Sequence, residues 1–123
     1  MARRHKIEQA LVVFVTASSE EEASRIGKRV VQDKLAACVT ILTGVRSLFW
    51  WEGRVAEERE TLMILKTRAS LFPELARVVK ALHSYQVPEI IALSVKKGSS
   101  DYLAWVAAVT DKPKKKFKKS KNG

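Results

Sequence analysis

Thirty residues in the middle of the chain, 38–67, read as two long strands joined by a two-residue turn. Glu52-Gly53 predicts the turn, because glycine adopts positive φ at no steric cost and such pairs favour tight hairpins. Gly44 interrupts the first strand and indicates a β-bulge or bend there. Both strands are longer than a small sheet needs, so the hairpin is expected to extend beyond its own sheet.

The end of this hairpin departs from the usual pattern of a strand. Side chains alternate along a strand, so Leu48 and Trp50 point to one face and Phe49 and Trp51 to the other. A face exposed to water would carry polar residues instead. Both faces are therefore predicted to be covered, and we assign Phe49, Trp50 and Trp51 to an interface between subunits.

Two serines predict where helices begin. Ser19 is followed three residues later by Glu22, which is the pattern of a capping box. Ser70 is expected to cap a second helix, with Pro73 tolerated in its first turn. The two acidic clusters, 20–22 and 57–60, are interpreted as solvated charge.

The order of predicted elements indicates the fold. Strand, helix, strand, strand, helix, strand and a last helix form the split βαβ pattern of an α+β, ferredoxin-like βαββαβ sandwich with a C-terminal helix. Right-handed crossovers place the two main helices on one face of an antiparallel sheet. The other face is predicted to lack helices and to associate with other subunits. The elements are strand 11–16, helix 20–34, strands 38–51 and 54–67, a helix after Ser70, strand 90–95 and helix 100–109.

The positive charge lies mainly at the ends of the chain. The formal net charge is +10, of which residues 111–123 carry +6 and residues 1–10 carry +2. A nearly neutral body argues against a basic groove, so no specific nucleic-acid partner is expected. We predict a single domain at 11–110 between a basic tail at 1–10 and a disordered, lysine-rich tail at 111–123. The alternative for the second tail is binding to RNA or to acidic lipid surfaces.

The single cysteine, Cys38, excludes an internal disulfide, which favours a reducing compartment and predicts a cytoplasmic protein. No apolar run approaches the roughly 20 residues that a membrane helix needs, so no membrane insertion is expected. The soft or borderline donors available for copper or zinc are Cys38, His5, His83, Met1 and Met63, and no two of them lie at a metal-ligand spacing. The alternatives are a buried apolar role for Cys38 and, for His83, stabilisation of the end of the second helix.

A second group of residues combines polar and aromatic side chains. Lys66 stands in an apolar strand, where a buried ammonium needs a partner. Two interpretations stay open for the group: an ion pair between subunits, or a cleft between subunits that binds a small ligand. Its members are Lys66, Tyr85, Glu89, Tyr102 and Trp105, with Gln86 and Asp101 nearby. The chain contains no serine nucleophile elbow, phosphate-binding glycine loop or His-Glu-x-x-His motif, and no enzyme is predicted.

Four segments together resemble the CutA divalent-cation-tolerance proteins over roughly 11–109. They are LAACVTILTGVRSLFWWEGRV, ETLMILKT, YQVPEI and DYLAW, in that order and spacing. The resemblance implies a homotrimer of ferredoxin-like subunits in which extended hairpins pair with strands of neighbouring subunits. It also implies divalent-ion binding and copper tolerance, with no settled enzymatic activity. The architecture is similar to that of PII-type signalling proteins.

The resemblance also implies candidate metal ligands. Copper-binding bacterial members carry a cysteine late in the first strand, where this chain has Val15. They close the second helix with a His-His pair, where this chain has Leu82-His83. His83 and Cys38 are therefore the expected metal ligands, with others shared across subunits. No cofactor is expected to be required for folding.

These observations lead to one main hypothesis and one alternative. The main hypothesis is a non-enzymatic, cytoplasmic homotrimer for divalent-metal tolerance and homeostasis, with copper as the expected type of ion. The alternative is a PII-like trimeric sensor or scaffold that binds a small anion or metabolite in clefts between subunits, which rests on analogy of fold.

Overall fold

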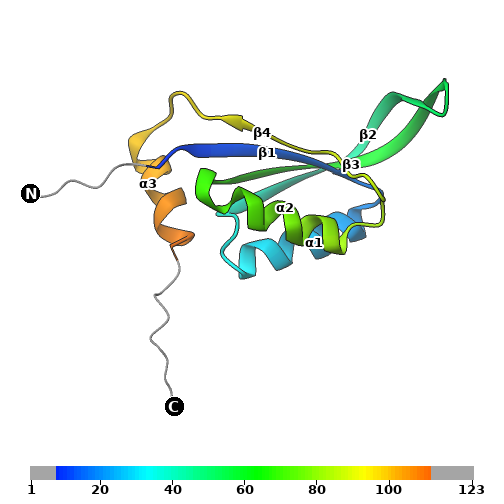
Figure 1. Ribbon diagram of the computed structural model, residues 1–123. Coiled ribbons are helices and arrows are strands. Elements are labelled where there is room, and N and C mark those ends of the chain that lie inside the picture. The colour runs from blue at the N-terminus through cyan, green and yellow to red at the C-terminus, as the bar shows by residue number, and fades with distance from the viewer. Residues whose placement is uncertain (1–7, 112–123) are drawn as a thin grey trace, which may run out of the picture.

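A four-stranded antiparallel sheet with the strand order β2-β3-β1-β4 forms the centre of the structure (Figure 1). This computed structural model describes residues 8–111, so the predictions for 1–7 and 112–123 lie outside it. The elements are β1 (Ala10–Ala17), α1 (Glu20–Gln32), β2 (Cys38–Trp51), β3 (Arg54–Arg68), the 3-10 turn η1 (Ala69–Leu71), α2 (Phe72–Leu82), β4 (Ile90–Ser94) and α3 (Ser100–Val109). The predicted ferredoxin-like βαββαβ order is confirmed.

Helices α1 and α2 lie side by side against one face of the sheet and enclose the core (Figure 1). The sheet contributes alternate residues of its two central strands, because every second side chain points to the same face. The helices contribute apolar residues at helical spacing. Fully buried members of this core are Val13, Val15, Met63 and Leu65 from the sheet, Ile26 and Val30 from α1, and Leu75 and Val79 from α2.

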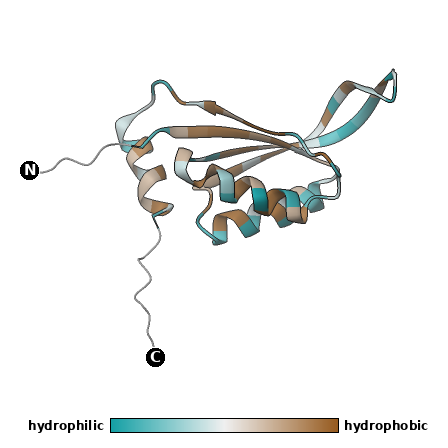
Figure 2. Ribbon diagram, in the orientation of Figure 1, coloured by the Kyte–Doolittle hydropathy of each residue, from teal (hydrophilic) through white to brown (hydrophobic). Residues whose placement is uncertain are grey.

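The opposite face of the sheet carries the other alternate residues. Phe14 of β1 lies between Ile64 of β3 and Ile91 of β4, and Leu93 lies one row further along. Ile91 and Leu93 are exposed, and Figure 2 shows hydrophobic residues following β1 and β4. We call this surface the open face. Its apolar character confirms the prediction that α1 and α2 leave one side of the sheet uncovered.

The helix predicted at 100–109 is present, but its position at one end of the open face was not predicted. Helix α3 lies at the end of the sheet away from the hairpin (Figure 1). Its Tyr102 contacts Cys38 and its Thr110 binds Arg68. Strand alternation places Cys38 and Arg68 on the open face, so the expected absence of helices is wrong at this end.

The β2–β3 hairpin has the predicted turn and bulge, and it projects beyond the rest of the sheet (Figure 1). Glu52 and Gly53 both have positive φ, 49° and 81°, which a tight type I′ hairpin turn requires. The register shifts between Leu42 and Val45, and Gly44 has φ of 72°. Local glycine chemistry therefore determines both the bend and the end of the hairpin.

The sequence predicted the start of α1 correctly but not the start of α2. Ser19 caps α1, because its hydroxyl accepts the N–H of Glu22 at 3.1 Å. The predicted cap at Ser70 is wrong, since α2 begins at Phe72 after a 3-10 turn. The N–H of Ser70 instead donates to the carboxylate of Glu8. The ordered fold thus includes Glu8, which lies in the segment predicted as a basic tail.

The cap of α1 gives a direct test of this helix start. Ser19→Ala removes the acceptor for the Glu22 N–H and is expected to lower the free energy of unfolding by about 1 kcal/mol. Ser24→Ala, in the middle of the same helix, is the matched control and is expected to be neutral or slightly stabilising, because alanine favours helix. Denaturant unfolding of both variants measures the difference, and equal stabilities would contradict the capping role.

Candidate functional site

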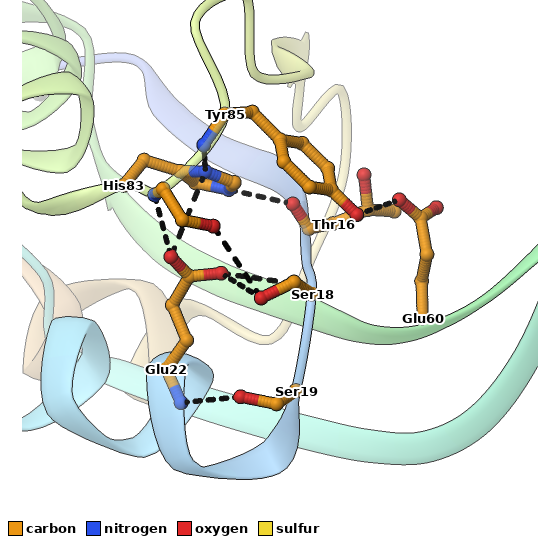
Figure 3. A network of polar contacts seen from close by, with 8 residues as sticks. Thr16, Ser18, Ser19, Glu22, Glu60, His83 and Tyr85 are labelled. Atoms are coloured by element: carbon orange, nitrogen blue, oxygen red, sulfur yellow. Dashed lines mark hydrogen bonds and ion pairs between the residues drawn. The ribbon is translucent and has the colours of Figure 1, made fainter.

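His83 ends α2, and its ring is held between two backbone groups (Figure 3). Nε2 lies 2.8 Å from the carbonyl oxygen of Thr16, and Nδ1 accepts the N–H of Tyr85 at 3.0 Å. An Nδ1 that accepts leaves the proton on Nε2, which then donates to Thr16. The side chain is 0% exposed. The imidazole therefore joins β1 to the segment after α2 and does not bind the carbonyl groups at the end of its own helix, as one interpretation expected.

The carboxylate of Glu22 lies beside this ring and connects the same two segments (Figure 3). It accepts the N–H and the hydroxyl of Ser18, both at 2.8 Å, and the N–H of Ser84 at 2.6 Å. Its side chain is 4% exposed. Burial alone raises the pKa of Glu22, but these hydrogen bonds outweigh it and lower the pKa to about 2. Glu22 is thus a buried, ionised anchor.

Tyr85 extends this network to the base of the hairpin. Its hydroxyl donates to the carboxylate of Glu60 at 2.8 Å, and its ring lies 4.8 Å from that of His83. Burial and the contact with Glu60 raise the pKa of Tyr85, so the phenol stays protonated. We call Glu22, His83, Tyr85 and Glu60 the buried network. The interpretation of Glu22 and Glu60 as solvated charge is wrong, because both are buried.

Lys66 lies at the other end of the sheet, on the open face. Its direct partner across the β2–β3 pair is Cys38, and the hydroxyl of Tyr102 lies 3.5 Å from the sulfur of Cys38. The ring of Tyr102 lies 5.6 Å from that of Trp105, one turn further along α3. The contact with Cys38 and burial raise the pKa of Tyr102, so its phenol stays protonated. We call Cys38, Lys66, Tyr102 and Trp105 the α3 cluster.

The structure divides the predicted cleft residues between these two places. Lys66 and Tyr102 both lie beside Cys38, and Tyr102 lies against Trp105, whereas Tyr85 belongs to the buried network. Glu60 and Lys66 are six residues apart on β3, which corresponds to about 20 Å along a strand. Glu89 is exposed just before β4. Within one chain, the predicted set does not form a single site.

The two expected metal ligands are also separated within one chain. Cys38 pairs with Lys66, whereas His83 binds Thr16, whose partner on β3 is Leu62. Both ring nitrogens of His83 are already hydrogen-bonded. Over residues 8–111, no group of three His, Cys, Asp or Glu side chains is arranged to hold a metal ion. A metal centre built from both residues would need donors from another subunit.

The end of the hairpin is apolar and exposed in the single chain. Trp50 is 74% and Trp51 60% exposed, and Leu48 and Phe49 are exposed beside them. Trp50 pairs with Val55 across the hairpin, so the same face carries another exposed apolar residue. Exposed apolar surfaces of this kind are typical of association sites. No helix in the described part of the chain is long and apolar enough to cross a membrane.

Together the fold and its surfaces define a class of protein: a ferredoxin-like subunit with an extended apolar hairpin and an open sheet face. The sequence profile of the CutA1 divalent ion tolerance protein family matches residues 11–109. The chain belongs to this family.

Individual relatives and solved structures agree with that assignment. The chain is 47% identical over 95 residues to the divalent-cation tolerance protein CutA of Thermus thermophilus, covering 77% of this chain and 92% of that protein. It is 46% identical over 97 residues to a chloroplastic CutA of rice; the match covers 79% of this chain but spans only 55% of that protein's length. The crystal structure of rice CutA1 aligns with a TM-score of 0.83 at 43% identity, covering 87% of this chain and 98% of that one. The CutA structure from Archaeoglobus fulgidus, described as periplasmic, aligns with a TM-score of 0.81 at 42% identity, covering 83% and 99%.

Proposed function

We propose that this protein is a cytoplasmic homotrimer that binds divalent metal ions of the copper type and contributes to metal tolerance without catalysing a reaction. Membership of the CutA1 divalent ion tolerance family is the observation that carries the proposal. The names of similar proteins, such as that of Thermus thermophilus, refer to divalent-cation tolerance. The family match covers residues 11–109.

The trimer is supported by the surfaces that one chain leaves exposed. The hairpin carries large aromatic side chains on both faces, and the open face carries exposed Ile91 and Leu93. Covering these surfaces with a second and third copy removes apolar area from water, which stabilises the assembly at about 25 cal/mol per Å². Three copies, rather than two, is the number that the family resemblance implies.

For metal binding we propose Cys38 as the more accessible ligand. Its thiol is half-buried and contacts Tyr102 alone among the described polar groups. Thiolate is a soft ligand that suits copper. His83 can bind a metal ion only if that ion replaces the hydrogen bond of one ring nitrogen, either to Thr16 or to Tyr85. We therefore expect Cys38 to contribute more than His83, with further donors from a neighbouring subunit.

Calorimetric titration with Cu²⁺ and Zn²⁺ tests this assignment. We expect wild type to bind copper below millimolar concentration and Cys38→Ser to weaken that affinity about tenfold or more, since a soft donor is lost. His83→Gln, which can keep a hydrogen bond near Thr16, is expected to have the smaller effect. Equal affinity in all three proteins would remove both residues from the metal site. No binding below millimolar would contradict the metal role altogether.

A second function is favoured by one specific observation, the unpaired Lys66. Within residues 8–111 this ammonium has neither an ion pair nor a hydrogen bond. We propose as the alternative a PII-like trimeric sensor or scaffold that binds a small anion or metabolite in clefts between subunits. A thermal-shift screen of nucleotides and organic acids tests it. If none of these compounds raises the unfolding temperature, the sensor function is contradicted and the metal proposal is retained.

A further inference from the structure

Lys66 has no charged residue in its own row of the open face. Its row on the open face runs from Cys38 through Lys66 and Val12 to Leu93. The side chain is half-buried in the single chain. Nothing in its own row can neutralise the ammonium.

The neighbouring rows do not supply a carboxylate either. Two residues back on β3, Ile64 lies beside Thr40 and Phe14. Two residues ahead, Arg68 binds Glu8 at 3.1 Å and Thr110 at 2.8 and 2.9 Å, so the carboxylate of Glu8 is already paired. A cation on a surface that assembly would cover loses water, and this costs free energy unless an anion replaces the water.

Helix α3 adds two groups that suit an anion with an apolar body. The hydroxyl of Tyr102 lies 3.5 Å from the sulfur of Cys38, and a hydroxyl can donate to an anion. The rings of Tyr102 and Trp105 lie together, tilted by 39°, and are 41% and 43% exposed. The core does not use these rings fully, because the buried residue of α3 is Val106. The α3 cluster thus combines one positive charge, one hydroxyl and two adjacent, partly exposed aromatic rings.

We propose that the α3 cluster binds a small organic carboxylate with a flat apolar body. Lys66 and the Tyr102 hydroxyl bind the carboxylate, and the rings of Tyr102 and Trp105 contact the body of the molecule. One ammonium and one hydroxyl match a single negative charge, whereas a polyphosphate needs several cations or a ring of backbone N–H groups. This inference rests on the second function proposed above and specifies its ligand class.

Benzoate is a suitable probe, and isothermal titration of the full chain is the measurement. We expect saturable binding of benzoate and weaker binding of benzamide, which lacks the charge, and of acetate, which lacks the ring. Lys66→Met is expected to weaken benzoate about tenfold, as the loss of a hydrogen bond to a charged group does. Lys80→Met, which removes an exposed lysine on α2, is the matched control and is expected to leave the affinity unchanged. Tyr102→Phe should also weaken benzoate, because the hydroxyl no longer donates to the carboxylate.

Three results would overturn the inference. The first is that benzoate shows no saturable binding to wild type. The second is that wild type and Lys66→Met bind benzoate with equal affinity. The third is that Lys66→Met no longer assembles while wild type does not bind benzoate. The last result would mean that a neighbouring chain's carboxylate neutralises Lys66. Light scattering on the same samples measures assembly separately. If other organic acids raise the unfolding temperature equally in wild type and Lys66→Met, the sensor function survives and the α3 cluster is not its site.

Discussion

Trp50→Glu combined with Trp51→Glu is expected to convert the assembled protein into single chains. The two side chains point to opposite faces of the hairpin end and are exposed in one chain. If neighbouring subunits cover them, each tryptophan is expected to stabilise the assembly by about 3–5 kcal/mol, as buried large aromatic side chains typically do. Glutamate would in addition place a charge in that apolar contact. Light scattering should show the mass fall from three chains of 13.8 kDa to one.

Arg25→Glu on the exposed side of α1 is the matched control, because it changes the net charge by the same two units. It is expected to leave the mass at three chains. A wild-type mass of one chain would contradict the proposed trimer at once. A double variant that keeps the wild-type mass would show that the tryptophans lie outside the interface, whatever holds the chains together.

The hairpin was predictable because its determinants are local. Gly44 and Gly53 occupy positions of positive φ, and the run between Cys38 and Trp51 has the composition of a strand. A strand, its bulge and its turn can therefore be recognised without knowing what lies nearby. The order of elements then restricts the fold to very few topologies.

The buried network was not predictable from the sequence because its contacts are distant along the chain. Glu22 binds Ser84, 62 residues away, and Glu60 binds Tyr85, 25 residues away. An acidic run such as Glu20–Glu22 does not reveal which of its members is buried. The position of Glu22, three residues after Ser19, did indicate a bonded side chain. A capping box predicts that Glu22 accepts the N–H of Ser19, but in the structure it accepts the N–H of Ser18.

The candidate cleft shows a second limit. Residue types suggested that Lys66 and Tyr85 belong together, but Tyr85 binds Glu60, and β3 places Glu60 and Lys66 toward opposite ends of the sheet. Conversely, the contact between Cys38 and Tyr102 depends on how α3 packs against the open face. A short helix with apolar residues around its circumference does not reveal that packing from its periodicity.

Glu22→Gln is expected to lower the free energy of unfolding at pH 7 by about 3 kcal/mol per chain. Folding lowers the pKa of Glu22 from 4.5 to about 2, and each pKa unit corresponds to 1.36 kcal/mol. Glutamine also presents one amide nitrogen where the carboxylate accepts hydrogen bonds from Ser18 and Ser84. Glu21→Gln, at an exposed position in the same first turn, is the control and is expected to cost a few tenths of a kcal/mol.

The pH dependence separates the ionised anchor from ordinary packing. Because the folded state binds the Glu22 proton more weakly than the unfolded state, this stabilisation is fully present above about pH 4.5 and is lost as the pH falls toward 2. Wild type should therefore lose about 3 kcal/mol more than Glu22→Gln across that interval, and Glu21→Gln should follow wild type. Denaturant unfolding at pH 7, 4.5, 3 and 2 measures the three curves. Parallel curves for wild type and Glu22→Gln would mean that Glu22 contributes by its shape and not by its charge.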